Sequence, residues 1–237
     1  MSDAANWWRL QRRLRDGQVC SAGRCVMTLD EPLPARSTTG VSCRRAAPRR
    51  QLQLPNAAAC AVRVELPFAF RYWSTNLAAG AMVNVATSGF LNLTGGTDTA
   101  RTGTIPSTVA PNGLIAPYWR DQRMRGGVCL ATLGAAPNRQ WVIEWNDAGF
   151  AATGDAGVSL DGGAPVAPES HLTYEVILTE GTNTIDFVYQ RMEPFLQATV
   201  GIENVTGASP GASGCPDPSV FACTPFPSYV VRFEPIP

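Results

Sequence analysis

The chain has 237 residues, with a hydrophobic fraction of 45% and a charged fraction of 16%, which is typical of a globular protein. Glycine and proline contribute 22 and 19 residues, a content that fits many turns between short strands and argues against a helical bundle. All 19 basic residues are arginine; ten of them lie in residues 1–60 beside four acids, and nine lie in 61–237 beside fifteen acids. The main part of the chain is therefore mildly acidic, which disfavours nucleic acid as its partner.

The first 59 residues lack a sustained hydrophobic pattern. Residues 1–19 contain no apolar stretch of the kind found in a secretory signal, and no run in the chain is long enough to cross a membrane. We expect residues 1–19 to be a frayed tail, with a short amphipathic helix at a membrane surface as the alternative. Residues 20–59 are rich in Arg, Pro, Ser and Thr, so the sequence predicts an irregular cysteine-bearing leader over 1–59.

Cysteine usage indicates an oxidising compartment, because seven cysteines are unusual for a cytosolic domain of this size. Cys20 and Cys25 have four residues between them, a spacing that could also form half of a zinc site, but a second such pair is missing and the single histidine, His171, is distant. We therefore predict that Cys20 and Cys25 are disulfide cysteines and not zinc ligands. The cysteines are Cys20, Cys25, Cys43, Cys60, Cys129, Cys215 and Cys223.

One disulfide is predicted specifically, between Cys215 and Cys223. Pro216 and Pro218 lie between them and favour a chain reversal, and closing so short a loop contributes roughly 2–3 kcal/mol of stability in the loop-entropy description. The odd number of cysteines leaves one thiol unpaired or bonded to another chain. The pairing of Cys43, Cys60 and Cys129 stays open at this stage.

Alternating strands begin at Cys60, where we place the start of a domain over 60–237. Val62, Val64 and Leu66 alternate with Ala61, Arg63 and Glu65, the pattern of a half-buried strand. Short strands of this regular spacing cannot bury their apolar faces singly, so we predict an all-β fold, a two-sheet antiparallel sandwich. The further strands are expected at 68–73, 82–86, 90–93, 113–119, 127–133, 139–145, 171–178, 184–189, 198–203 and 229–234.

Residues of one phase within each strand form the predicted core. In the strand 139–145, Trp141, Ile143 and Trp145 share one face, while Glu144 faces the other way. Two connections stand apart from the strands: 94–112, and the long polar insertion 147–170, whose length is typical of a functional or mobile loop. The predicted core residues are Trp119, Trp141, Ile143, Trp145, Val176, Leu178, Phe187, Val200 and Ile202.

Several pieces between Leu66 and Gly207 share their order and spacing with a known domain family. Examples are Val83-Asn-Val-Ala-Thr-Ser-Gly-Phe-Leu, Asn112-Gly-Leu-Ile-Ala-Pro-Tyr-Trp-Arg-Asp and Ala198-Thr-Val-Gly-Ile-Glu-Asn-Val-Thr-Gly. In these the chain resembles extracellular β-sandwich domains of bacterial, myxobacteria-like surface proteins, which are related to the nidogen-like (NIDO) domain. The resemblance implies an extracellular or cell-surface module in adhesive or matrix-like proteins, without known catalytic residues.

Catalytic motifs are missing from the sequence. His171 opens a strand and no Gly-x-Ser-x-Gly turn accompanies it; no phosphate-binding loop or dinucleotide motif is present. Glu144 and Glu175 are the best candidates for a glycosidase pair, but their phase places both on an outer, solvated strand face. We therefore predict no catalytic residue, no cofactor site and no metal site.

A calcium site in the insertion is the open alternative to a metal-free chain. The three acids in and beside the insertion are spaced too widely for an EF-hand loop, although an irregular loop site stays possible in principle. These acids are Asp147, Asp155 and Asp161.

The sequence favours a non-catalytic interaction module at the cell surface or outside the cell, with a protein or glycan surface as its partner. Binding residues usually lie on loops held by a rigid scaffold, so the expected contact surface is 147–170, helped by 94–112 if both lie at one end. The alternative is a carbohydrate-active sandwich, either a lectin-like binder or a hydrolase. Exposed tryptophans beside Glu144 and Glu175 would favour that alternative, and buried tryptophans the module.

Overall fold

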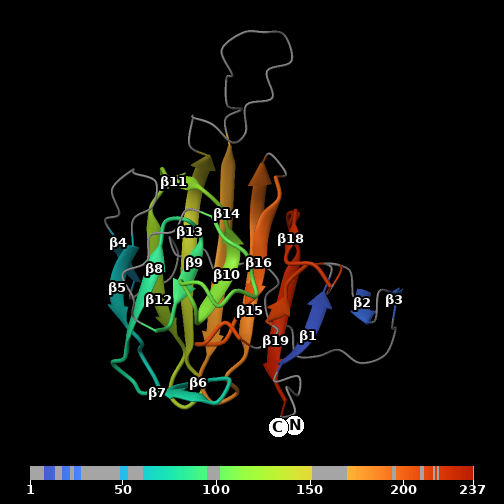
Figure 1. Cartoon of the computed structure of the whole chain (residues 1–237). Coiled ribbons are helices and arrows are strands. Elements are labelled where there is room, and N and C mark those ends of the chain that lie inside the picture. The colour runs from blue at the N-terminus through green and yellow to red at the C-terminus, as the bar shows by residue number, and fades with distance from the viewer. Residues whose placement is uncertain are drawn as a thin grey trace, which may run out of the picture.

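The computed structural model describes residues 8–13, 18–21, 24–27, 49–52, 61–94, 102–150, 170–193, 196–208, 211–215, 217 and 219–236. These residues form strands, turns and bends, with no helix among them. Two antiparallel sheets are stacked face to face, and a small hairpin lies at one end (Figure 1). The predicted all-β sandwich is confirmed.

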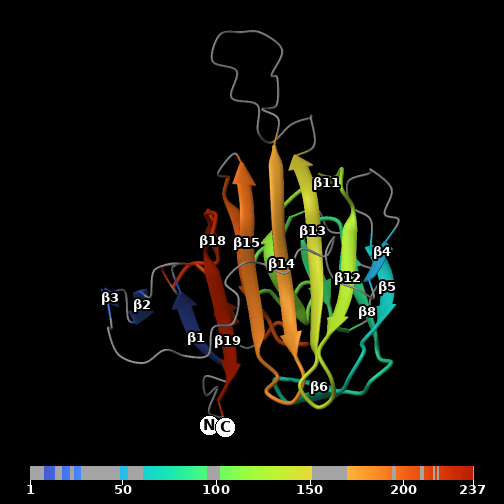
Figure 2. The same cartoon turned by 180° about the vertical axis from the view of Figure 1, so that it is seen from behind.

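The larger sheet contains ten of the described strands, in the order β3-β2-β1-β19-β15-β14-β13-β12-β4, with β11 paired to β13. Seen from behind, its central strands β12 to β15 run side by side along the length of the molecule (Figure 2). The strands are β1 (Trp8–Arg13), β2 (Gln18–Ser21), β3 (Arg24–Met27), β4 (Arg49–Leu52), β11 (Gln122–Met124), β12 (Val128–Leu133), β13 (Gln140–Phe150), β14 (His171–Thr179), β15 (Ile185–Glu193) and β19 (Val230–Pro235).

The smaller sheet has the order β17-β16-β10-β9-β8-β5, with β18 paired to β16. A separate hairpin, β6–β7, lies at the lower end in Figure 1. The strands are β5 (Ala61–Glu65), β6 (Phe70–Tyr72), β7 (Thr75–Leu77), β8 (Met82–Ala86), β9 (Phe90–Asn92), β10 (Leu114–Trp119), β16 (Ala198–Ile202), β17 (Ala212–Ser213) and β18 (Ala222–Cys223).

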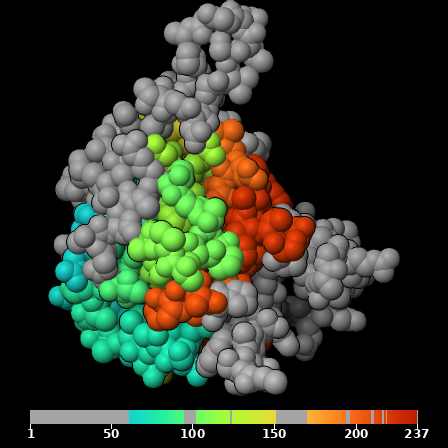
Figure 3. Space-filling model, viewed as in Figure 1, coloured from blue at the N-terminus to red at the C-terminus, as the bar shows by residue number. Residues whose placement is uncertain are grey.

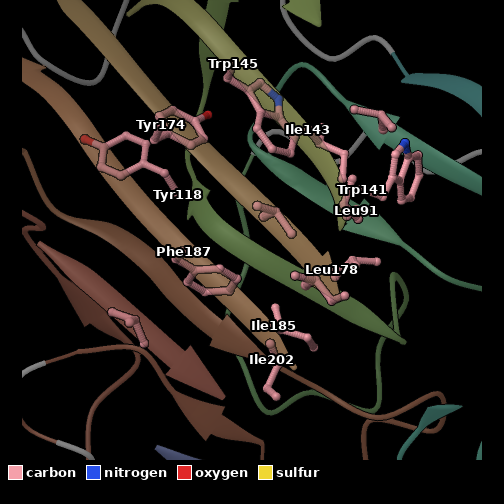
Figure 4. Packing of buried hydrophobic residues seen from close by; sticks show 14 of the residues in the cluster. Leu91, Tyr118, Trp141, Ile143, Trp145, Tyr174, Leu178, Ile185, Phe187 and Ile202 are labelled. Carbon is pink, nitrogen blue, oxygen red and sulfur yellow. The ribbon is translucent and has the colours of Figure 1, made fainter. Parts of the chain in front are cut away.

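The main core fills the space between the two sheets, as the alternating pattern predicts. Trp141, Ile143 and Trp145 lie in it together, which confirms their shared face. Figure 4 shows them in the same cluster as Leu91 of the smaller sheet, Tyr174 and Ile202. Of the predicted core, the following residues belong to this cluster: Trp141, Ile143, Trp145, Val176, Leu178, Phe187, Val200 and Ile202.

At the upper end in the view of Figure 1, the core is aromatic and contains buried polar side chains that hydrogen-bond to each other. Tyr174 stacks on Trp145 with ring centroids 5.3 Å apart, and Gln122 Nε2 donates to the Tyr174 hydroxyl at 2.5 Å. Gly89 has φ +82° and packs so closely that a Cβ there would lie 2.1 Å from the carbonyl oxygen of Tyr118. Only glycine therefore fits this turn between β8 and β9.

Trp119 is buried as predicted, but it lies outside the main core. It belongs to a second cluster with Phe90, Ile105 and Leu114 on the outer face of the smaller sheet. The register between β10 and β16 shifts between Ala116 and Trp119, and such an irregularity reverses the alternation of side chains. The strict alternation assumed for this strand was therefore wrong after Ala116.

The expectation of a frayed tail or a short helix over residues 1–19 was wrong for the described part. Trp8–Arg13 is strand β1, and it pairs with β19 over its whole length, from Trp8 opposite Pro235 to Arg13 opposite Val230. At the opposite edge of the larger sheet, β4 pairs with β12. An unpaired edge strand leaves backbone donors and acceptors open, which gives these distant segments a reason to pair. The domain boundary at residue 60 stays a prediction.

Candidate functional site

Glu144 and Glu175 are directly opposite each other on β13 and β14, so their Cβ atoms lie about 5 Å apart. They face away from the main core, as predicted, but they are not solvated: their exposed fractions are 1% and 0%. Gln190 Nε2 donates to Glu175 Oε1 at 2.6 Å. The expectation of solvated positions was wrong, because alternation identifies the face of a strand and not whether that face is covered.

The buried position of this pair bears on sugar chemistry. A glycosidase needs both carboxyl groups within reach of a substrate and of water, and neither is reachable from solvent in this structure. Trp141 and Trp145 are buried on the opposite face of the same strand. Neither of these two tryptophans therefore forms an aromatic platform beside Glu144 and Glu175.

A partly exposed cluster of charged and polar side chains lies at the end of the sheet from which the insertion leaves. His171 Nδ1 lies 2.6 Å from Asp147 Oδ1 and 3.2 Å from Arg125 Nη2. Arg125 Nη2 is also 3.5 Å from Asp147 Oδ1. These side chains are 38% (Arg125), 37% (Asp147) and 28% (His171) exposed. We call Arg125, Asp147 and His171 the rim cluster.

Charge compensation within the rim cluster stabilises the ionised form of Asp147. Partial burial alone would raise the pKa of Asp147, but the hydrogen bond with His171 and the positive charge of Arg125 together lower it below its ordinary value. Asp147 also has a left-handed backbone, with φ +50°. That conformation is uncommon for a residue other than glycine. It turns the Asp147 side chain out of the regular strand direction and toward His171.

The base of the insertion is held closed by hydrogen bonds between β13 and β14. The Phe150 N–H donates to Ser170 Oγ at 2.7 Å, and the Asp147 N–H donates to Thr173 Oγ1 at 3.3 Å. The guanidinium of Arg120 lies over the Phe150 ring, 5.3 Å from its centroid. β13 thus continues to Phe150, beyond the predicted end at 145, so the loop itself is shorter than the sequence indicated.

Sequence reasoning did not identify the rim cluster. His171 was interpreted as the first residue of a strand, which is correct, but its partners come from β13 and from the residue after β11. The pairing of Gln122 with Phe150 and of Met124 with Ala148 brings Arg125 to this end. The only signal in the sequence was the position of Asp147 and His171 at the two ends of the insertion.

The other acids considered for calcium give no site in the described part of the chain. Asp155 and Asp161 lie outside the described residues. Among the described residues, no group of three His, Cys, Asp or Glu side chains is arranged to hold a metal ion. The calcium alternative stays a prediction without a structural counterpart.

The connection 94–112 is described at residue 94 and at residues 102–112. The part over 102–112 packs over the outer face of the smaller sheet, where Ile105 belongs to the second cluster. Thr199 Oγ1 donates to the Gly103 carbonyl at 2.5 Å, and the Ser107 N–H donates to Glu203 Oε2 at 2.6 Å. Residues 102–112 thus cover the outer face of the smaller sheet, and the expected help of this connection at the contact surface stays a prediction.

Glu203 makes the attachment of residues 102–112 dependent on pH. Its side chain is buried, and burial raises its pKa from 4.5 to about 7 although the Ser107 N–H partly offsets this. Between those pH values the folded protein holds a proton that the unfolded chain releases, so stability falls as pH rises toward 7. At pH 8 we expect the free energy of unfolding of Glu203→Gln to be roughly 1–3 kcal/mol higher than that of wild type. At pH 4 the two free energies of unfolding should be nearly equal.

Urea denaturation at the two pH values measures this difference. A control of opposite sign is Glu180→Gln, because hydrogen bonds from Arg139 lower the pKa of Glu180; that variant should be less stable than wild type at pH 8. A Glu203→Gln protein that loses stability at pH 8 would contradict the assigned direction.

Comparison with known proteins then assigns the fold to a family. The family model described as NIDO related matches residues 48–220, more than two thirds of the chain. The chain belongs to the NIDO-related family. No curated protein and no solved structure matches it significantly. The match begins before residue 60, so it includes β4 as well as the strands from β5 to β17. NIDO-related domains are a family of non-enzymatic modules, and membership of it suggests an extracellular-type module.

The cysteines of this NIDO-related chain agree with that setting. Cys215 and Cys223 form the predicted disulfide, with Cα atoms 5.7 Å apart, within the usual range for a disulfide. Cys129 is disulfide-bonded as well. Cys20 and Cys25 are directly opposite each other in the β2–β3 hairpin, and their disulfide stays a prediction. Disulfides of this kind persist in oxidising compartments.

Within the described part of the chain, no helix is long and apolar enough to cross a membrane.

Proposed function

We propose that this chain is a non-catalytic interaction module of an extracellular or cell-surface protein, of the bacterial type that its sequence resembles. We place its contact surface at the rim from which the insertion 151–169 leaves. The observation that carries the proposal is the rim cluster, in which charged groups from separate strands converge and stay partly exposed. Membership of the NIDO-related family and the disulfides support the location.

The rim cluster continues into a second exposed ion pair. Glu193 on β15 is opposite His171 in the register, and Arg191 Nη2 lies 2.9 Å from Glu193 Oε2. Both side chains are more than half exposed. The surface formed by Arg125, Asp147, His171, Arg191 and Glu193 therefore carries both signs of charge, an arrangement that contributes more to the choice of partner than to raw affinity.

A rigid base favours binding at this place. The hydrogen bonds of Phe150 and Asp147 tie the last residues of β13 to β14, so the rim side chains are held before a partner arrives. Preorganised groups lose less conformational entropy on binding. A partner that presents complementary charges, on a protein or on an acidic or amino-bearing glycan, fits this surface.

Catalysis is not part of the proposal. The carboxylate pair that could hydrolyse a sugar is buried, and the tryptophans of the same strand are in the core. His171 is engaged with Asp147 and Arg125. The described residues thus offer no nucleophile with an adjacent base in an open pocket.

The test is binding of the full chain to a glycan array and to a panel of immobilised, purified extracellular proteins. For the strongest ligand found, Arg125→Ala should weaken binding by about tenfold or more, the effect of losing one central charged contact. Arg71→Ala is the matched control, because Arg71 is an exposed arginine on β6 at the opposite end; its affinity should equal that of wild type.

Two results would overturn the proposal. One is a ligand whose binding is lost in Arg71→Ala and kept in Arg125→Ala. The other is release of reducing ends from a glycan by the wild-type chain, together with loss of that activity in Glu175→Gln.

A further inference from the structure

β5 forms one edge of the smaller sheet, with β8 as its single described neighbour. It lies at the side of the molecule in both cartoon views (Figure 1 and Figure 2). In the space-filling view, the cyan residues at the start of the sandwich lie at the outer edge of the molecule (Figure 3). Within the part of the chain that the structure describes, no strand pairs with the other side of β5.

The direction of the backbone groups of β5 follows from the ladder. The Leu66 N–H donates to the Ala81 carbonyl at 2.9 Å, and the register continues from Glu65 opposite Met82 to Ala61 opposite Ala86. Hydrogen-bonded residues alternate along an antiparallel pair, so Val62 and Val64 bond to β8. The N–H and C=O groups of Arg63 and Glu65 consequently point to the open edge.

The side chains at this edge carry opposite charges. Val64 is buried in the core, while Arg63 and Glu65 are exposed. Neither has an ion-pair partner among the described residues. The two charges are two residues apart, so they lie on the same face of the strand.

We infer that β5 is a self-complementary edge that pairs with β5 of a second copy of this chain, in antiparallel orientation around a twofold axis at Val64. In this register Arg63 is opposite Glu65 of the other copy, and the same pair occurs again on the other side of the axis. The backbone groups of both residues face the partner strand, so the ladder can form at these positions. The smaller sheet then continues from one copy into the other.

Charge selects this register over its neighbours. A shift that keeps the outward backbone groups opposite one another places Arg63 against Arg63, or Glu65 against Glu65. Like charges directly opposite in a sheet are unfavourable. Charged residues at an edge usually keep two copies apart. Here Arg63 and Glu65 oppose association in the neighbouring registers and favour it in the register with the twofold axis at Val64.

The interface is small, since it is built on a five-residue strand. A specific, stable complex usually buries a much larger area, so the expected dimer is weak and depends on concentration. Its two exposed ion pairs are screened by salt. Dimerisation should therefore weaken when the ionic strength rises.

Charge reversal with rescue tests the inference on the full chain by sedimentation equilibrium. Over protein concentrations of about 5–500 μM in about 50 mM NaCl, wild type should dimerise, and raising NaCl to about 500 mM should weaken the dimer. Arg63→Glu and Glu65→Arg should each raise the dissociation constant by roughly tenfold or more, because each places like charges opposite each other twice. The double variant Arg63→Glu/Glu65→Arg restores both ion pairs and should return to near the wild-type value.

Arg71→Glu is the control, because it changes the net charge by the same amount as Arg63→Glu at an exposed position on another hairpin. It should leave the dissociation constant unchanged. The inference is overturned by a chain that stays monomeric at every concentration, by a dimer that survives both single reversals, or by a double variant as weak as the singles. It is equally overturned by a dimer that disappears only on addition of reductant, which would be an interchain disulfide.

Discussion

Replacing Trp145 with alanine should lower the free energy of unfolding by about 3–5 kcal/mol, the usual cost of removing a large aromatic side chain from a packed core. Trp145 is fully buried, and its ring is nearly parallel to that of Tyr174, with an interplanar angle of 15°. Its Nε1–H donates to the Ala86 carbonyl at 2.8 Å, so it joins the larger sheet to the smaller one. Urea denaturation followed by fluorescence and circular dichroism measures the loss.

Trp145→Phe is the matched control, because it keeps most of the ring and removes the hydrogen bond. Its expected loss is about 1–2 kcal/mol, the range for a buried hydrogen bond together with a small change in volume. If Trp145→Ala and Trp145→Phe were equally stable, the ring would not be packed as the structure shows.

Replacing Arg232 with methionine should cost about 2–4 kcal/mol. Asp186 is 4% exposed, and Arg232 donates to it twice, at 2.6 Å from Nε and 2.8 Å from Nη2. Without the guanidinium, a carboxylate stays buried without its main partner, which is the costly way to break such a pair. The estimate is below the usual maximum because the Arg232 side chain is 24% exposed.

The double variant Asp186→Leu/Arg232→Met separates the cost of an uncompensated charge from the value of the pair. Replacing both members of a buried ion pair with apolar residues is often close to neutral, so the double variant should recover most of the loss. Arg191→Met, which breaks the exposed pair with Glu193, should change stability by less than about 1 kcal/mol. A double variant less stable than the single one would contradict this account.

Strands with a clear period of two were predictable from sequence because each needs one buried face. The shared phase of Trp141, Ile143 and Trp145 identified their common face, and the core confirms it. Trp119 went to the other cluster because the register shift after Ala116 is not visible in a pattern of apolar residues. A local irregularity of one residue thus changed the face of a side chain whose burial was predicted correctly.

Contacts between distant parts of the chain set the limit of prediction for the candidate site. The rim cluster depends on β11 pairing with β13 and on β13 meeting β14 across the insertion. The covering of Glu144 and Glu175 is another such effect, since the alternation of their own strands is the same whether that face is open or buried. The pairing of β1 with β19 links residues near the two ends of the sequence.

That last pairing has a mechanical consequence. Trp8 is opposite Pro235, so the first and last described strands begin and end side by side at the same end of the sheet (Figure 1). Tension applied through both ends of the chain would pull these two neighbours apart from that end, and hydrogen bonds in an antiparallel pair loaded in this way break one after another. The hydrogen bonds between β1 and β19 should therefore break in sequence at low force, with the rest of the sandwich still folded.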